Sequence, residues 1–218
     1  MILILFIFST PWFQRMISLN FSMAFVVLIL TYLLIEIGLN NNRNRLLIIF
    51  FIILVFVTSL YTVVLGFDKK INYVSADENV VLNNNHLYYS EHLGKIYLNK
   101  FGLYYNKNLA VTLDSIYRNI FYGVDLNTYF FDGHPRERRG VQEFSKFWGI
   151  LLPVFILGLF RALVGNYSLI NGFFIVALIT SSVISPAYNL SLIMYFPFIV
   201  CLIWLGFKTI FQKINLIL

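Results

Sequence analysis

The sequence predicts a mainly α, polytopic helical membrane protein with about five transmembrane helices and a small mixed extracytoplasmic loop subdomain. Of its 218 residues, 59% are hydrophobic and only 12% are charged, which lies far outside the composition of soluble domains. Five apolar runs are also long enough to cross a hydrocarbon core of about 30 Å as helices. Each is expected to be helical because lipid offers the backbone no hydrogen-bond partner. The runs are 16–38, 46–66, 147–165, 168–186 and 192–211.

These runs divide the chain into three parts: N-terminal membrane helices (1–66), an extracytoplasmic loop subdomain (67–146) and a C-terminal three-helix membrane bundle (147–218). The middle part holds nine of the ten carboxylates and ten of the sixteen lysines and arginines. Chemistry in water is therefore expected there. The opening apolar run, 1–8, is too short to span a bilayer, and it lacks the basic start and cleavage site of a signal peptide.

The basic residues of the short loops predict the orientation. In a five-span arrangement they all fall on one side, which the positive-inside rule makes cytoplasmic. The N-terminus and the 67–146 segment then face outward across a plasma (inner) membrane, with the C-terminus in the cytoplasm. The residues concerned are Arg43, Arg45, Arg161, Lys208 and Lys213.

Within the middle part, residues 71–77 have the β-branched and aromatic mix of a short strand. Residues 108–123 carry apolar side chains at three- and four-residue spacing, and Gly123 supplies a stop signal. This pattern predicts a helix that either lies flat at the membrane interface or covers a strand layer. Five tyrosines suit interface anchoring, and sugar stacking is the alternative; they are Tyr88, Tyr89, Tyr97, Tyr104 and Tyr105.

The stretch "FFDGHPRERRG" (130–140) is the strongest candidate binding site. Arginines can hold a phosphate or diphosphate bidentately beside a helix end, while a nearby carboxylate handles a sugar hydroxyl. The alternative is that the arginines contact lipid headgroups and that Asp132 and Glu137 screen them. The candidate residues are Asp132, His134, Arg136, Arg138 and Arg139.

Other chemistries are not expected. His86, His92 and His134 lack the spacing of zinc ligands, so no metal or cofactor is predicted. The single cysteine, Cys201, has no disulfide partner in the chain. Despite the net charge of +6, the basic residues do not form one stripe with interleaved aromatic residues, so no nucleic acid is expected as a partner.

Three patches resemble known sequences. The longest, "LNTYFFDGHPRERRGVQEFSKFWGILLPVFILGLF", combines an aromatic pair, Gly133-His134-Pro135, Arg138, Gly140 and a Leu-Pro helix start. The other two are "STPWFQRMISLNF" and "ISPAYNLSLIMYFPFIVCLIWLGF". Together they resemble the C-type membrane glycosyltransferase superfamily, which includes the protein O-mannosyltransferases and their bacterial relatives.

The resemblance implies hexosyl or mannosyl transfer from a polyprenyl-phosphate donor to a lipid, glycan or protein acceptor on the outer membrane face. In that family a carboxylate in the first outer loop is the general base. This loop lies upstream of the Ser-Pro-Trp-like segment, near which this chain begins. The chain is therefore predicted to be a C-terminal portion, truncated or reduced. Asp132 and His134 remain as acid/base candidates, and Arg136, Arg138 and Arg139 as donor-phosphate ligands.

The sequence leaves open whether the chain needs a partner and whether it is an enzyme. A partner membrane protein is one possible source of the missing part. The rival function is a non-catalytic membrane scaffold or lipid-binding protein.

Overall fold

The computed structural model describes residues 2–40, 44–66, 76–131, 144–165, 167–184 and 190–214. Every regular element in these ranges is helical. The elements are α1 (Ile2–Ser9), α2 (Pro11–Leu19), α3 (Phe21–Gly38), α4 (Arg45–Gly66), α5 (Ala76–Leu93), α6 (Lys95–Leu98), α7 (Lys100–Tyr104), the π-helix η1 (Tyr105–Leu109), α8 (Ala110–Val124), α9 (Asn127–Phe130), the 3-10 helix η2 (Gly149–Leu151), α10 (Leu152–Val164), α11 (Ser168–Ser182) and α12 (Tyr195–Ile214).

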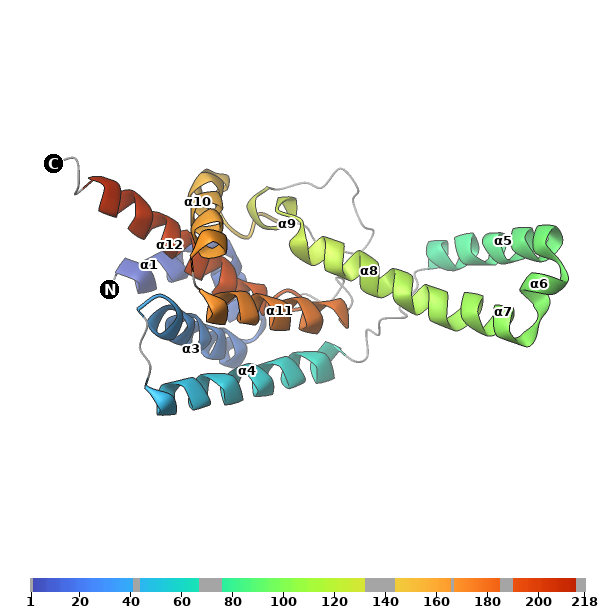
Figure 1. Cartoon of the computed structure of the whole chain (residues 1–218), viewed down its shortest axis with the longest axis horizontal. Coiled ribbons are helices and arrows are strands. Elements are labelled where there is room, and N and C mark those ends of the chain that lie inside the picture. The colour runs from blue at the N-terminus through green and yellow to red at the C-terminus, as the bar shows by residue number, and fades with distance from the viewer. Residues whose placement is uncertain are drawn as a thin grey trace.

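The long helices form a bundle with an arm. Helix α3 packs against α4, α11 and α12, and α10 packs across α12 (Figure 1). Helices α5 to α8 extend from one end of this bundle, and only α8 packs closely against α11. The predicted mainly helical architecture is therefore confirmed. Among the described residues, three helices are long and apolar enough to cross a membrane alone: α3, α4 and α12.

The first predicted span, 16–38, is interrupted. Asn20 ends α2 and also begins α3, since its Oδ1 accepts a hydrogen bond from the backbone N–H of Met23 at 3.1 Å. Asparagine favours such capping because its short side chain competes for backbone groups. The candidate span here is therefore α3, with 18 residues. Helices α1 and α2 form a separate pair bent by 71°.

The runs 147–165 and 168–186 do not form two separate spans. Helices α10 and α11 have 13 and 15 residues, fewer than the roughly 20 needed. They are bent by 113° relative to each other and qualify together as one broken span or re-entrant loop. Helix α10 starts late, beside Pro153, and ends at Val164, because the backbone of the next residue, Gly165, is extended. The described residues thus provide three candidate spans, or up to five if each bent pair counts as one.

Of the remaining predicted elements, the helices are present and the strand is partly wrong. The helices predicted at 46–66, 108–123 and 192–211 are present as α4, α8 and α12. The strand predicted at 71–77 is wrong for Ala76 and Asp77, which begin α5. Residues 71–75 lie outside the described part of the chain. From Ala76 to Phe131 the loop subdomain is helical rather than mixed.

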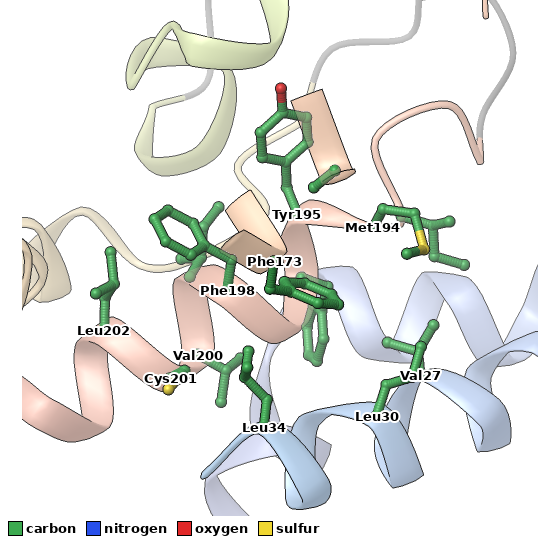
Figure 2. Close-up of a cluster of buried hydrophobic side chains, with 14 of the residues drawn as sticks. Val27, Leu30, Leu34, Phe173, Met194, Tyr195, Phe198, Val200, Cys201 and Leu202 are labelled. Atoms are coloured by element: carbon green, nitrogen blue, oxygen red, sulfur yellow. The ribbon is translucent and has the colours of Figure 1, made fainter. Parts of the chain in front are cut away.

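Apolar side chains fill the centre of the bundle. Figure 2 shows Leu34 of α3 facing the side of α12 that carries Val200, with Phe173 of α11 nearby and Leu30 beside Val27 further along α3. Phe173 also contacts Phe51 of α4, with ring centroids 5.9 Å apart. This core joins four helices.

The end of the bundle opposite the arm carries a polar network. Lys208 Nζ donates to Asn40 Oδ1 at 2.8 Å, and Asn40 Nδ2 donates to Glu36 Oε2 at 2.9 Å. Arg45 begins α4 at the same end. Lys208 of α12 and Arg45 of α4 therefore lie at the same end of the bundle. Arg43 lies outside the described residues.

Glycines bring α10 and α12 into close contact. A Cβ atom at Gly158 would overlap the carbonyl oxygen of Leu202, and one at Gly206 would overlap that of Val154. Ala162, four residues after Gly158, is buried on the same face. Small residues at this spacing let helix backbones approach in lipid, where van der Waals packing drives association.

We expect Gly158→Leu to lower the stability of the protein by at least about 2 kcal/mol, because the side chain must push α12 away. Thermal melting in detergent, followed by size-exclusion chromatography, measures this. Gly172→Ala is the matched control, since a Cβ atom there meets nothing within 4 Å. Equal melting temperatures for the two variants would contradict the close contact.

Candidate functional site

The predicted site residues fall in one stretch that the structure does not describe. Asp132, His134, Arg136, Arg138 and Arg139 lie within residues 132–143, hereafter the arginine stretch. Both flanks of the arginine stretch are described, up to Phe131 on one side and from Phe144 on the other. The site is therefore built from these flanks.

Backbone hydrogen bonds join the two flanks. The carbonyl oxygen of Tyr129 accepts from the N–H groups of Lys146 at 3.0 Å and Phe147 at 2.8 Å. The N–H of Trp12 donates to the carbonyl oxygen of Lys146 at 3.2 Å. The two flanks of the arginine stretch therefore lie next to each other, beside the start of α2.

Local sequence explains why α2 starts there. Thr10 is the N-cap of α2, and its hydroxyl accepts a hydrogen bond from the N–H of Phe13 at 3.4 Å. Pro11 follows at the first helical position, where its fixed φ suits a helix and its missing N–H has no cost. This start fixes the position of Trp12.

An aromatic cluster surrounds the joined flanks. The ring of Trp12 lies 5.7 Å from the ring of Tyr129, 5.7 Å from Phe147 and 5.4 Å from Phe196, measured between centroids. Phe13 and Phe147 stack on Phe196 from separate elements. Such ring pairs stabilise by about 0.5–1.5 kcal/mol beyond their buried area. The aromatic cluster, Trp12, Phe13, Tyr129, Phe130, Phe147 and Phe196, is buried.

A lysine is buried beside these rings. Lys146 is 8% exposed, and its Nζ donates to the carbonyl oxygen of Thr128 at 2.7 Å. The Nζ also lies 5.7, 5.5 and 5.3 Å from the ring centroids of Trp12, Tyr129 and Phe144. The guanidinium of Arg15 lies 4.4 Å from the Phe144 ring. Aromatic faces attract cations, more strongly where water is excluded, so two positive groups are fixed where the arginine stretch begins and ends.

Polar groups from neighbouring helices complete this end of the bundle. The hydroxyl of Tyr129 donates to the carbonyl oxygen of Gly123 at 2.7 Å, and Ser181 Oγ lies 3.1 Å from Tyr195 Oη. A Cβ atom at Gly123 would lie 2.6 Å from Tyr195 Oη, so a larger residue would displace that hydroxyl. These contacts connect α8, α9, α11 and α12.

Tyr129 is a neutral donor here. Burial raises the pKa of Tyr129 well above its usual value, and the neighbouring Tyr195, Tyr122 and Asp125 raise it further. A buried hydroxyl that stays protonated can donate to Gly123 at every physiological pH. It orients the residues around Lys146 without adding charge.

Lys146, Arg15 and Tyr129 are parts of this site that were not predicted from the sequence. The available signal was "FSKFW" (144–148), a lysine between aromatic residues immediately before an apolar run. Its enclosure depends on Trp12, more than 130 residues away in the sequence, so the signal alone did not distinguish it from a lysine at a membrane surface. Among the described residues, no group of three or more His, Cys, Asp and Glu side chains could hold a metal ion.

We expect Tyr129→Phe to lower stability at neutral pH by about 1 kcal/mol through loss of one hydrogen bond. The raised pKa also makes the native protein's stability fall as pH rises above about 10, where unfolded tyrosine ionises. Melting curves across this range should fall less steeply for Tyr129→Phe than for the native chain. Tyr117→Phe, at an exposed position, should keep the native slope; identical slopes for all three would refute the assignment.

Comparison with known proteins finds no matching family model, no matching curated protein and no matching solved structure.

Proposed function

We propose that this protein is a C-terminal portion or reduced form of a C-type membrane glycosyltransferase, and that it binds a polyprenyl-phosphate-linked sugar beside Lys146. One observation carries the proposal. The three sequence patches that resemble the family meet in the aromatic cluster, through Trp12, Phe147 and Phe196. Segments that share a functional site are expected to converge in this way.

The charges at this end favour a phosphate ligand. Lys146 and Arg15 lie at the base of the arginine stretch, which supplies Arg136, Arg138 and Arg139 within a few residues. Guanidinium groups match phosphate geometry bidentately, whereas an ammonium acts as a point charge. Directly after the site, the exposed side chains of Ile150 and Ile156 offer an apolar surface for a polyprenyl chain.

The proposed reaction is a displacement at the anomeric carbon. The acceptor hydroxyl oxygen forms the new bond, the bond from the sugar to phosphate oxygen breaks, and the phosphate leaves with the electron pair. Asp132 and His134 are the candidates to remove the acceptor proton. The arginines would stabilise the charge on the leaving phosphate. We assign this end to the extracytoplasmic face because Arg45 and Lys208 gather at the opposite end.

A second function is a non-catalytic, lipid-binding scaffold that docks a partner membrane protein. The arm favours it, because helices α5, α6 and α7 expose large apolar side chains. Exposed apolar patches mark interaction sites. These side chains include Leu87, Tyr88, Leu98, Phe101 and Tyr104.

We expect the triple change of Arg136, Arg138 and Arg139 to Ala to weaken polyprenyl-phosphate binding at least tenfold, about 1.4 kcal/mol. Native mass spectrometry of the detergent-solubilised chain, titrated with polyprenyl phosphate, measures this. The control changes Arg45, Arg161 and Lys208 to Ala, which removes the same charge elsewhere. Equal loss in both variants would mean that only net charge matters and would refute the site.

Sugar transfer separates the two functions. Membranes that contain the native chain are supplied with a radioactive hexose linked to polyprenyl phosphate. If the protein is a glycosyltransferase, the radioactive hexose should appear on a lipid, glycan or protein acceptor. Tight phosphate binding without any transfer would leave the scaffold as the function.

A further inference from the structure

Helix α8 turns its apolar face outward. Leu113, Tyr117 and Phe121 recur every four residues, so they share one face of the helix. They are 52%, 62% and 57% exposed. No described element covers this face.

The polar face of α8 turns inward. Ser115 and Asn119, also four residues apart, are 7% and 6% exposed. Asn119 Nδ2 donates to the carbonyl oxygen of Ser182 at 3.0 Å, which ties α8 to the end of α11. A helix on the surface of a water-soluble protein has the reverse arrangement. Apolar groups outside and satisfied polar groups inside suit a helix surrounded by lipid.

A charged pair borders the apolar face. Arg118 Nε lies 3.2 Å from Asp114 Oδ2, and both side chains are partly exposed. An apolar face flanked by charges that reach toward water is the pattern of an interfacial helix. Tyr117 adds an amphipathic ring of the kind enriched at membrane surfaces.

The neighbouring surface indicates what covers this face. Helix α8 packs against α11, whose Ile175 and Ile179 are exposed in the same way. The long span α4 also exposes an apolar face, which includes Ile53. In a chain with membrane-spanning helices, lipid is the partner that covers such faces continuously.

We infer that the Leu113–Phe121 face of α8 lies in the boundary between lipid headgroups and acyl chains, at the Lys146 end of the bundle. The C-terminal half of α8 joins the bundle through Asn119 and Gly123. Phe121 is therefore the deepest of the three side chains and Leu113 the shallowest. This inference does not depend on glycosyl transfer.

Nitroxide accessibility tests the inference. Single cysteines replace Leu113, Tyr117, Phe121, Asp114 or Ile53 in the full chain, which is labelled with a methanethiosulfonate nitroxide. The labelled chain is reconstituted in vesicles of phosphatidylethanolamine and phosphatidylglycerol. Cys201 is fully buried, and the labelled parent chain reports any background from it. Collision rates with oxygen and with a water-soluble nickel chelate are measured at each position.

The nickel collision rate at Phe121→Cys should be several-fold below that at Asp114→Cys and approach that of Ile53→Cys. Oxygen collisions should rise from Leu113→Cys through Tyr117→Cys to Phe121→Cys. Nickel accessibility as high as that of Asp114→Cys would place the face in water and overturn the inference. Low collision rates with both reagents would show that protein covers this face, and this result would also overturn the inference. Each variant is first checked for native elution by size-exclusion chromatography.

Discussion

The carbonyl oxygen of Tyr129, shared by the N–H groups of Lys146 and Phe147, is the interaction on which this end of the protein depends. It closes the chain around the arginine stretch, and the bond from Trp12 to Lys146 adds the start of α2 to the same point. Without this closure, Lys146 would lose the rings and the Thr128 carbonyl that make its burial tolerable. Three segments far apart in sequence would then have no common position.

The bundle must hold this point in place under the conditions of a membrane. Lipid chains are as apolar as leucine, so burial of side chains provides little drive for one helix to bind another. The contact between α10 and α12 relies instead on glycines that let the backbones touch, with Val154 and Leu202 as the opposing groups. Helix α8 also contacts the bundle through a polar group, since the buried Asn119 side chain is hydrogen-bonded to α11. Its apolar Phe121 side chain faces away from the bundle. Small residues and satisfied polar groups therefore act at these contacts beside the apolar core.

The helical class and the long apolar helices α3, α4 and α12 could be predicted from apolar length, because lipid leaves the backbone few alternatives. The span boundaries could not, since Asn20 acts as a cap within an apolar run and Gly165 ends α10 before it is long enough to cross. A hydropathy profile averages over a window of residues, so it does not show that Asn20 and Gly165 interrupt an apolar run. The arginines were evident as a local cluster, whereas the enclosure of Lys146 arises from long-range packing that no local pattern records. The predicted site residues Asp132 and His134 fall outside the described residues and stay predictions.

The central claim is that the joined flanks of the arginine stretch form a lipid-phosphate site. Photo-crosslinking with a diazirine-bearing polyprenyl phosphate, added to membranes and followed by peptide mapping, tests it most directly. Adducts are expected to concentrate in residues 131–150 and at the start of α2 near Arg15, and unlabelled polyprenyl phosphate should abolish them. Adducts spread along the exposed face of α4, or unaffected by the competitor, would contradict it.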